Sequence, residues 1–108
     1  MIARPFEYHA PATLLPDVIG LLGQYGEEAK MLAGGHSLLP MMKLRFATPG
    51  HLIDLGRITE LKGIKQVGGA VHIGAMTTEN DVIWSSLLAA KVPLLVEGAR
   101  LIADPQVR

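Results

Sequence analysis

Two adjacent glycines followed by a histidine and a serine are the residues of this chain best suited to binding chemistry. Between two apolar runs stand Gly34, Gly35, His36 and Ser37. Glycine lets the backbone turn sharply and lets another group approach its N–H groups closely. A helix that begins just after such a turn adds unpaired N–H donors and the positive end of its dipole. The pattern therefore favours an anion site, above all for a phosphate group of a nucleotide cofactor.

The glycine pair alone does not decide between a phosphate site and a plain tight connection from strand to helix. It matches neither G-x-G-x-x-G nor G-x-x-x-x-G-K-[ST], the two glycine patterns whose phosphate geometry is well defined. Both interpretations stay open until the elements around the pair are considered.

Those elements predict a strand, a turn, a helix and a second strand. Residues 30–33 and 51–55 are short apolar strands, and residues 37–44 between them form a short helix that Ser37 or His36 caps. This order predicts a βαβ crossover with parallel strands. A short edge strand over residues 5–9 and an amphipathic helix that starts at Thr13 and stops at Gly26 precede it.

After Gly56 the pattern changes. Residues 64–67 and 71–74 flank two glycines and predict a β-hairpin, and a final helix starts at Pro93. The fold class is therefore α/β (α+β), with an N-terminal βαβ lobe over residues 1–56. Residues 57–108 form an incomplete second lobe, the start of an antiparallel sheet with flanking helices.

Composition excludes several classes of protein. The 108 residues carry no net charge, so a nucleic-acid partner is not expected. Cysteine is absent, which excludes disulfides and cysteine-ligated iron–sulfur clusters within this chain and fits a cytoplasmic location. The most apolar window, residues 87–103, is interrupted by charged residues and a proline, so no membrane span is predicted.

Four segments extend the glycine pattern into a family resemblance. They are AGGHSLLP at 33–40 with MKLR at 42–45, LIDL at 52–55, IGAMTT at 73–78 and ADPQVR at 103–108. In order and spacing they resemble the FAD-binding medium subunit of molybdenum hydroxylases, the group of aerobic carbon monoxide dehydrogenase and xanthine dehydrogenase. The resemblance covers nearly the whole chain.

The resemblance implies an oxidoreductase flavoprotein with a PCMH-type FAD-binding fold, in which FAD lies between two lobes. Electrons pass from a molybdenum cofactor in a large subunit through two [2Fe-2S] clusters in a small subunit to FAD, and then to an external acceptor. The molybdenum and the clusters belong to partner subunits only, and the assembly is expected to be a dimer of heterotrimers in the cytoplasm. The cofactor itself carries the redox chemistry.

The resemblance also implies the cofactor-binding positions. They are Leu32, Ala33, Gly34, Gly35, His36, Ser37, Leu38, Thr77 and Ile102. The positions from 33 to 37 match the pyrophosphate-cradling loop, and the leucines on either side match cofactor-lining positions. Ile102 matches a position near the flavin ring, and Thr77 matches a turn of the second lobe. No residue is assigned a catalytic role.

In the family, the segment at 103–108 runs on into an asparagine and a Thr-x-Gly-Gly turn that also contacts FAD, and the sequence stops short of it. The isolated chain is therefore expected to be inactive as an enzyme. The alternative is a truncated, non-catalytic interaction module that does not hold FAD alone.

The remaining histidines are not expected to bind metal. His9, His51 and His72 are well separated in the sequence and lack ligand spacing such as H-E-x-x-H, so surface or strand positions are expected for them.

Overall fold

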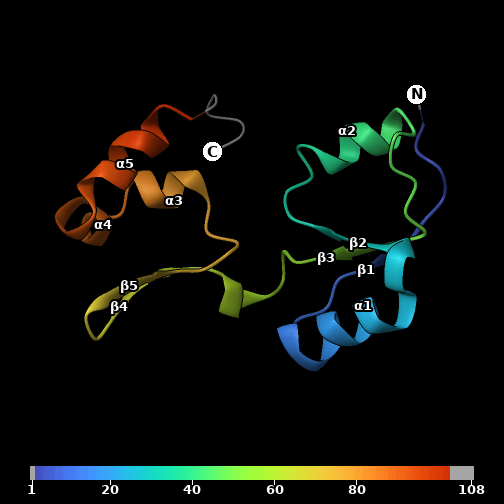
Figure 1. The fold of residues 1–108 in the computed structure, drawn as a ribbon, viewed down its shortest axis with the longest axis horizontal. Coiled ribbons are helices and arrows are strands. Elements are labelled where there is room, and N and C mark those ends of the chain that lie inside the picture. The colour runs from blue at the N-terminus through green and yellow to red at the C-terminus, as the bar shows by residue number, and fades with distance from the viewer. Residues whose placement is uncertain (1, 103–108) are drawn as a thin grey trace. The chain divides into compact units, whose positions relative to one another are not determined.

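The computed structural model describes residues 2–102 and divides the chain into two compact units, Met1–Thr59 and Glu60–Arg108 (Figure 1). The boundary falls a few residues beyond Gly56. Residues after this glycine stay with the first unit, because the N–H of Ile58 donates to the carbonyl of Leu55 at 3.1 Å and the Ile58 side chain is fully buried. Each unit has its own core.

The first unit is built on a parallel three-stranded sheet. Its strands are β1 (Glu7–His9), β2 (Ala29–Leu32) and β3 (His51–Asp54), in the order β1-β3-β2. The central strand β3 contributes Leu52 and Ile53 to the core, and both are almost completely buried. The predicted parallel pairing of the two strands around the glycine turn is confirmed.

Helices flank this sheet. The predicted amphipathic helix consists of a π-helical turn η1 (Leu14–Val18) followed by α1 (Ile19–Tyr25). Pro16, which has no N–H to donate, lies inside the irregular turn. The helix ends at Gly26, whose φ is +55°, before the short 3₁₀ turn η2 (Gly26–Glu28). In Figure 1, α1 and α2 (Leu38–Lys43) lie to either side of the three strands.

The second unit contains the predicted hairpin and three helices. The antiparallel strands are β4 (Ile64–Val67) and β5 (Ala70–Ile73), and the 3₁₀ turn η3 (Thr59–Leu61) precedes them. The helices are α3 (Glu79–Ile83), α4 (Ser86–Lys91) and α5 (Pro93–Arg100). Helix α4 was not predicted. Its N-cap is local: the Ser85 hydroxyl accepts from the N–H of Leu88 at 3.1 Å.

An aliphatic cluster holds the second unit together. Its buried members are Val82, Ile83, Leu88, Val96 and Ala99, and Ile64 and Val71 of the hairpin pack against them. At the end of the hairpin the backbone approaches itself so closely at Gly74 that a Cβ there would lie 2.3 Å from the carbonyl oxygen of Leu61. Only glycine fits at this position.

The described part of the chain includes every predicted site residue. The segment at 103–108 that contributed to the family resemblance lies outside it. Within residues 2–102, every helix is too short, or insufficiently apolar, to cross a membrane.

Candidate functional site

The predicted glycine turn follows the carboxyl end of β2 and leads into α2. Gly34 has φ +76° and Gly35 has φ +85°, so both adopt a backbone conformation that residues with a Cβ rarely take. Two such residues in succession reverse the chain between strand and helix. The tight turn expected from the sequence is therefore present.

The two glycines are needed for different reasons. A Cβ on Gly35 would lie 2.6 Å from Cδ1 of Leu39 and 3.2 Å from Cδ1 of Leu32, and Gly35 itself is buried. At Gly34 the nearest atom to a Cβ would be Cδ2 of His36, at an ordinary 3.7 Å. A Cβ at 35 would therefore displace the Leu39 side chain as well as strain the backbone dihedral, whereas at 34 only the dihedral opposes it.

The helix after the turn contributes less to an anion site than the sequence suggested. Helix α2 has six residues, so its dipole is small. Ser37 occupies the N-cap position in an αR conformation, and its side chain makes no capping hydrogen bond. Ser37, one of the two capping residues predicted, is thus at the N-cap, but its side chain does not cap the helix, because an N-cap side chain normally needs an extended backbone to reach back to the helix N–H groups. The turn is closed instead by the N–H of Leu39, which donates to the carbonyl of Gly35 at 3.0 Å.

A pocket of about 250 Å³ opens beside the turn. Its lining residues are Met31, Ala33, Gly35, His36, Ser37 and Leu38. The side chains of His36 and Ser37 are exposed, and the lining contains no carboxylate. Within residues 2–102, the N–H groups of Gly35 and His36 donate to no backbone acceptor. The pocket thus offers N–H and O–H donors without a repelling negative charge, which suits an anion.

The other two predicted site residues belong to the second unit. Oγ1 of Thr77 donates to the carbonyl of Gly63 at 3.2 Å and accepts from its N–H at 3.1 Å, so this hydroxyl ties two loops of that unit together. Ile102 borders an apolar pocket of about 520 Å³ together with Val92 and Leu95. The structure thus groups the residues from 32 to 38 around one turn and places Thr77 and Ile102 in a different unit.

The structure brings together two histidines that the sequence separates. Nε2 of His9 lies 3.1 Å from Nδ1 of His51, and the Glu7 carboxylate lies 3.4 Å from the same Nδ1. The expected strand positions of His9, His51 and His72 are confirmed, and the parallel pairing of β1 with β3 brings the first two together although they are 42 residues apart. An edge strand over residues 5–9 was predicted, but its partner strand and its register were not. Knowing that β1 pairs with β3 in this register would have predicted the contact between His9 and His51.

Tyr8 and Asp54 form a second contact between the same two strands. The Tyr8 hydroxyl donates to Oδ2 of Asp54, and this hydrogen bond is the main cause that raises the pKa of Tyr8 above its ordinary value. Oδ1 of Asp54 accepts from the N–H of Gly56 at 2.8 Å. Asp54 therefore fixes the end of β3 instead of taking part in the glycine turn.

Comparison with known proteins gives a consistent family. The family described as the FAD binding domain in molybdopterin dehydrogenase matches residues 4–108. The carbon monoxide dehydrogenase medium chains of Hydrogenophaga pseudoflava and Afipia carboxidovorans are 63% and 53% identical over the whole chain, which covers 37% of each relative. The xanthine dehydrogenase FAD-binding subunit of Escherichia coli O157:H7 is 36% identical over 94% of the chain and 34% of its own length.

Solved structures agree on the fold. A carbon monoxide dehydrogenase from Hydrogenophaga pseudoflava, which lacks the Mo-pyranopterin moiety of its cofactor, matches with a TM-score of 0.95 over the whole chain and 37% of its own. Quinoline 2-oxidoreductase from Pseudomonas putida 86 matches with a TM-score of 0.91 at 36% identity, over 99% of this chain and 37% of its own. The expected fold class is confirmed. The chain spans little more than a third of the length of these relatives.

Proposed function

Because this chain belongs to the FAD-binding domain family of molybdopterin dehydrogenases, we propose that it binds FAD as part of the medium subunit of a molybdenum hydroxylase. The observation that carries the proposal is the glycine turn over residues 34–35, with its donor-lined pocket, inside a family match of nearly the whole chain. When bound, FAD supplies the redox chemistry, taking electrons from iron–sulfur clusters of a partner subunit and passing them to an external acceptor.

The turn is proposed to hold the pyrophosphate. The backbone N–H groups of Gly34, Gly35 and His36 donate to phosphate oxygens, and the Ser37 hydroxyl adds a further donor. The His36 imidazole donates from the exposed side of the pocket. The fit is supported by the N–H groups of Gly35 and His36, which donate to no backbone acceptor within residues 2–102, and by the lack of a carboxylate in the pocket lining.

Apolar residues next to the turn are proposed to line the cofactor. Leu32, Ala33 and Leu38 exclude water from one side of the pyrophosphate, which strengthens its hydrogen bonds to the turn. Ile102 gives an apolar contact near the flavin ring. The Thr77 hydroxyl is already engaged with Gly63, so its part is to hold a turn that faces the cofactor.

The reaction proposed for the whole protein is of the carbon monoxide dehydrogenase type. Two medium chains of that enzyme are 63% and 53% identical to this chain. The medium chain of a glyceraldehyde dehydrogenase and the medium subunit of a nicotine 6-hydroxylase are 40% and 39% identical to it. Partners follow from the same proposal: a large molybdenum-cofactor subunit and a small iron–sulfur subunit, assembled as a dimer of heterotrimers in the cytoplasm. The family match favours this role over a non-catalytic interaction module.

Flavin content of the purified full-length protein tests the proposal. Gly35→Asp places a side chain in occupied space and a negative charge at the turn, so the visible flavin absorbance should be lost. Gly68→Asp is the matched control, because Gly68 also has a positive φ, +59°, but has open space around it and lies in the β4–β5 turn. Ser37→Ala should weaken FAD binding by about 10–100-fold, the value of one hydrogen bond to a charged group. Full flavin content in Gly35→Asp would contradict the proposal.

A further inference from the structure

The register of the first sheet gathers three metal-ligating side chains on one face. Glu7 on β1 pairs with His51 on β3, and His9 is two residues beyond Glu7 on the same strand. Because side chains alternate along a strand, Glu7 and His9 point to the same side as each other and flank His51. On the other side of His51, β2 presents the small Ala29. The cluster therefore takes its ligands from two neighbouring strands.

The three ligand atoms lie at distances that one proton does not satisfy. Nδ1 of His51 is 3.1 Å from Nε2 of His9 and 3.4 Å from the Glu7 carboxylate, and the three ligand atoms all lie within 4.8 Å of one another. A single N–H on Nδ1 of His51 has to be shared between the ring nitrogen of His9 and the Glu7 carboxylate. A cation among the three atoms satisfies all of them.

Two of the three separations between ligand atoms are close to those in a tetrahedral metal centre. Zinc bonds to histidine nitrogen and carboxylate oxygen of about 2.0–2.2 Å place tetrahedral ligand atoms roughly 3.3–3.5 Å apart. Nδ1 of His51 lies 3.1 Å from His9 and 3.4 Å from Glu7, and the third separation is no more than 4.8 Å. Two imidazoles and one carboxylate are also a ligand set that zinc uses when a water fills the fourth position.

An aromatic ring orients the imidazoles. The Tyr25 ring stacks on His51 with centroids 3.6 Å apart and planes 13° apart, and it lies 5.4 Å from the His9 ring. Side-chain accessibility of His51 is 14%, whereas that of Glu7 is 71%. The His51 ring is thus held in place before any ion arrives, and the exposed Glu7 is able to close on it.

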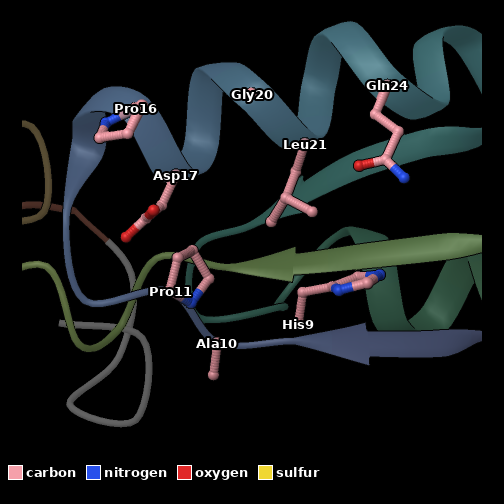
Figure 2. A pocket seen from close by; sticks show the side chains of 8 residues that line it. All are labelled: His9, Ala10, Pro11, Pro16, Asp17, Gly20, Leu21 and Gln24. Atoms are coloured by element: carbon pink, nitrogen blue, oxygen red, sulfur yellow. The ribbon is translucent and has the colours of Figure 1, made fainter.

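The cluster is open to solvent through a pocket under α1. His9 borders this pocket of about 540 Å³, whose lining also includes Asp17 and Gln24. Figure 2 shows Leu21 and Gln24 extending from the helix toward the strands, with His9 on β1 below them. The pocket gives an ion a route to His9 and room for the water that completes its coordination.

We propose that His9, His51 and Glu7 bind a divalent transition metal ion, with Zn²⁺ as the best match to the ligand set. The site joins β1 to β3 through Glu7 and His9, the first and last residues of β1, and His51, the first residue of β3, whereas the glycine turn follows the carboxyl end of β2. The two sites share no residue, and the metal has a structural role that does not depend on FAD.

Zinc uptake by the purified full-length protein tests this proposal. The protein is incubated with Zn²⁺, desalted and assayed by elemental mass spectrometry, and affinity is measured by titration calorimetry. We expect one equivalent per chain. His9→Ala and His51→Ala should each weaken binding by more than ~100-fold, beyond the 10–100-fold effect typical of outer-shell partners. His72→Ala, which changes an exposed histidine of the second unit, is the matched control and should bind normally.

A second variant separates loss of binding from loss of folding. Glu7 is exposed, so Glu7→Gln should keep the circular dichroism spectrum and flavin content of the parent while it weakens Zn²⁺ binding by about tenfold or more. Zinc K-edge absorption should show two imidazole ligands in the parent. No zinc uptake by the parent, or equal affinity in the parent and in His9→Ala, would overturn the proposal and show that the two rings share only a proton.

Discussion

The parallel sheet of the first unit carries two sites that are built in different ways. The glycine turn is made of consecutive residues, and its shape depends on two backbone dihedrals and on the contact between Gly35 and Leu39. The histidine cluster takes residues from β1 and β3, which are 42 positions apart at the closest contact. Its shape depends on strand register and on the ring of Tyr25.

This difference teaches that the two sites respond to different kinds of change. A substitution that disturbs the backbone of the turn should alter FAD binding and leave zinc binding intact. A substitution that shifts β1 against β3 should do the reverse. Measuring both ligands on every variant therefore tests whether the two sites are independent.

The largest effect is expected from Gly35→Ala. The new methyl group would lie 2.6 Å from Cδ1 of Leu39, which is an overpacked contact costing about 1–3 kcal/mol, and the positive φ adds about 1–2 kcal/mol. Urea unfolding should therefore show a loss of roughly 2–5 kcal/mol, and flavin content should fall while zinc uptake stays.

Two further variants separate the cost of the backbone dihedral from the cost of the contact with Leu39. Gly68→Ala carries the dihedral cost without the contact, so it should lose only about 1 kcal/mol. Adding Leu39→Ala to Gly35→Ala removes the colliding side chain and should restore part of the loss. Equal losses in Gly35→Ala and Gly68→Ala would show that packing around the turn is unimportant.

A smaller effect is expected from Tyr25→Leu. Leucine keeps apolar bulk but removes the stacking on His51, which is worth about 0.5–1.5 kcal/mol for an aromatic pair. Zinc affinity should fall about tenfold because the imidazole is no longer oriented, as for other outer-shell partners. Flavin content should be unchanged. If Tyr25→Leu lost FAD and zinc together, the two sites would not be independent.

The smallest effect concerns Tyr8, which lies between Glu7 and His9 on β1 and points to the opposite face of the strand. Its pKa is raised in the folded protein by the hydrogen bond to Asp54. The contact therefore stabilises the fold fully at pH values below the ordinary tyrosine pKa of about 10. Its contribution is lost as the pH rises through the higher pKa that Tyr8 has in the folded protein. Alkaline unfolding of Tyr8→Phe should depend less on pH in this range.

Ultraviolet titration gives the direct check. Comparing the parent with Tyr8→Phe identifies the Tyr8 component by difference, and Tyr25 is the other tyrosine of residues 1–108. That component should titrate above pH 10 in the folded protein. A Tyr8 component at its ordinary pKa would show that the hydrogen bond from Tyr8 to Asp54 is not kept in solution.

Local sequence signals predicted most of the elements. Gly26 ends α1, Pro93 begins α5, and two glycines join β4 to β5, because each of these residues restricts or frees its own backbone. Helix α4 was missed, since its six residues have a serine cap but lie within one long apolar window. Ser37 is at the predicted N-cap, but its side chain does not cap α2, because a residue type does not reveal its backbone dihedrals.

The sequence by itself determined the family, the parallel βαβ order and the position of the glycine turn, because consecutive residues carry all three. Only the tertiary structure decided that Gly35 is enclosed by Leu32 and Leu39, and that His9 and Glu7 meet His51. The physical reason is that strand pairing is a long-range interaction. A shift of one residue in register would send Glu7 and His9 to the opposite face, and no residue pattern within β1 fixes that register.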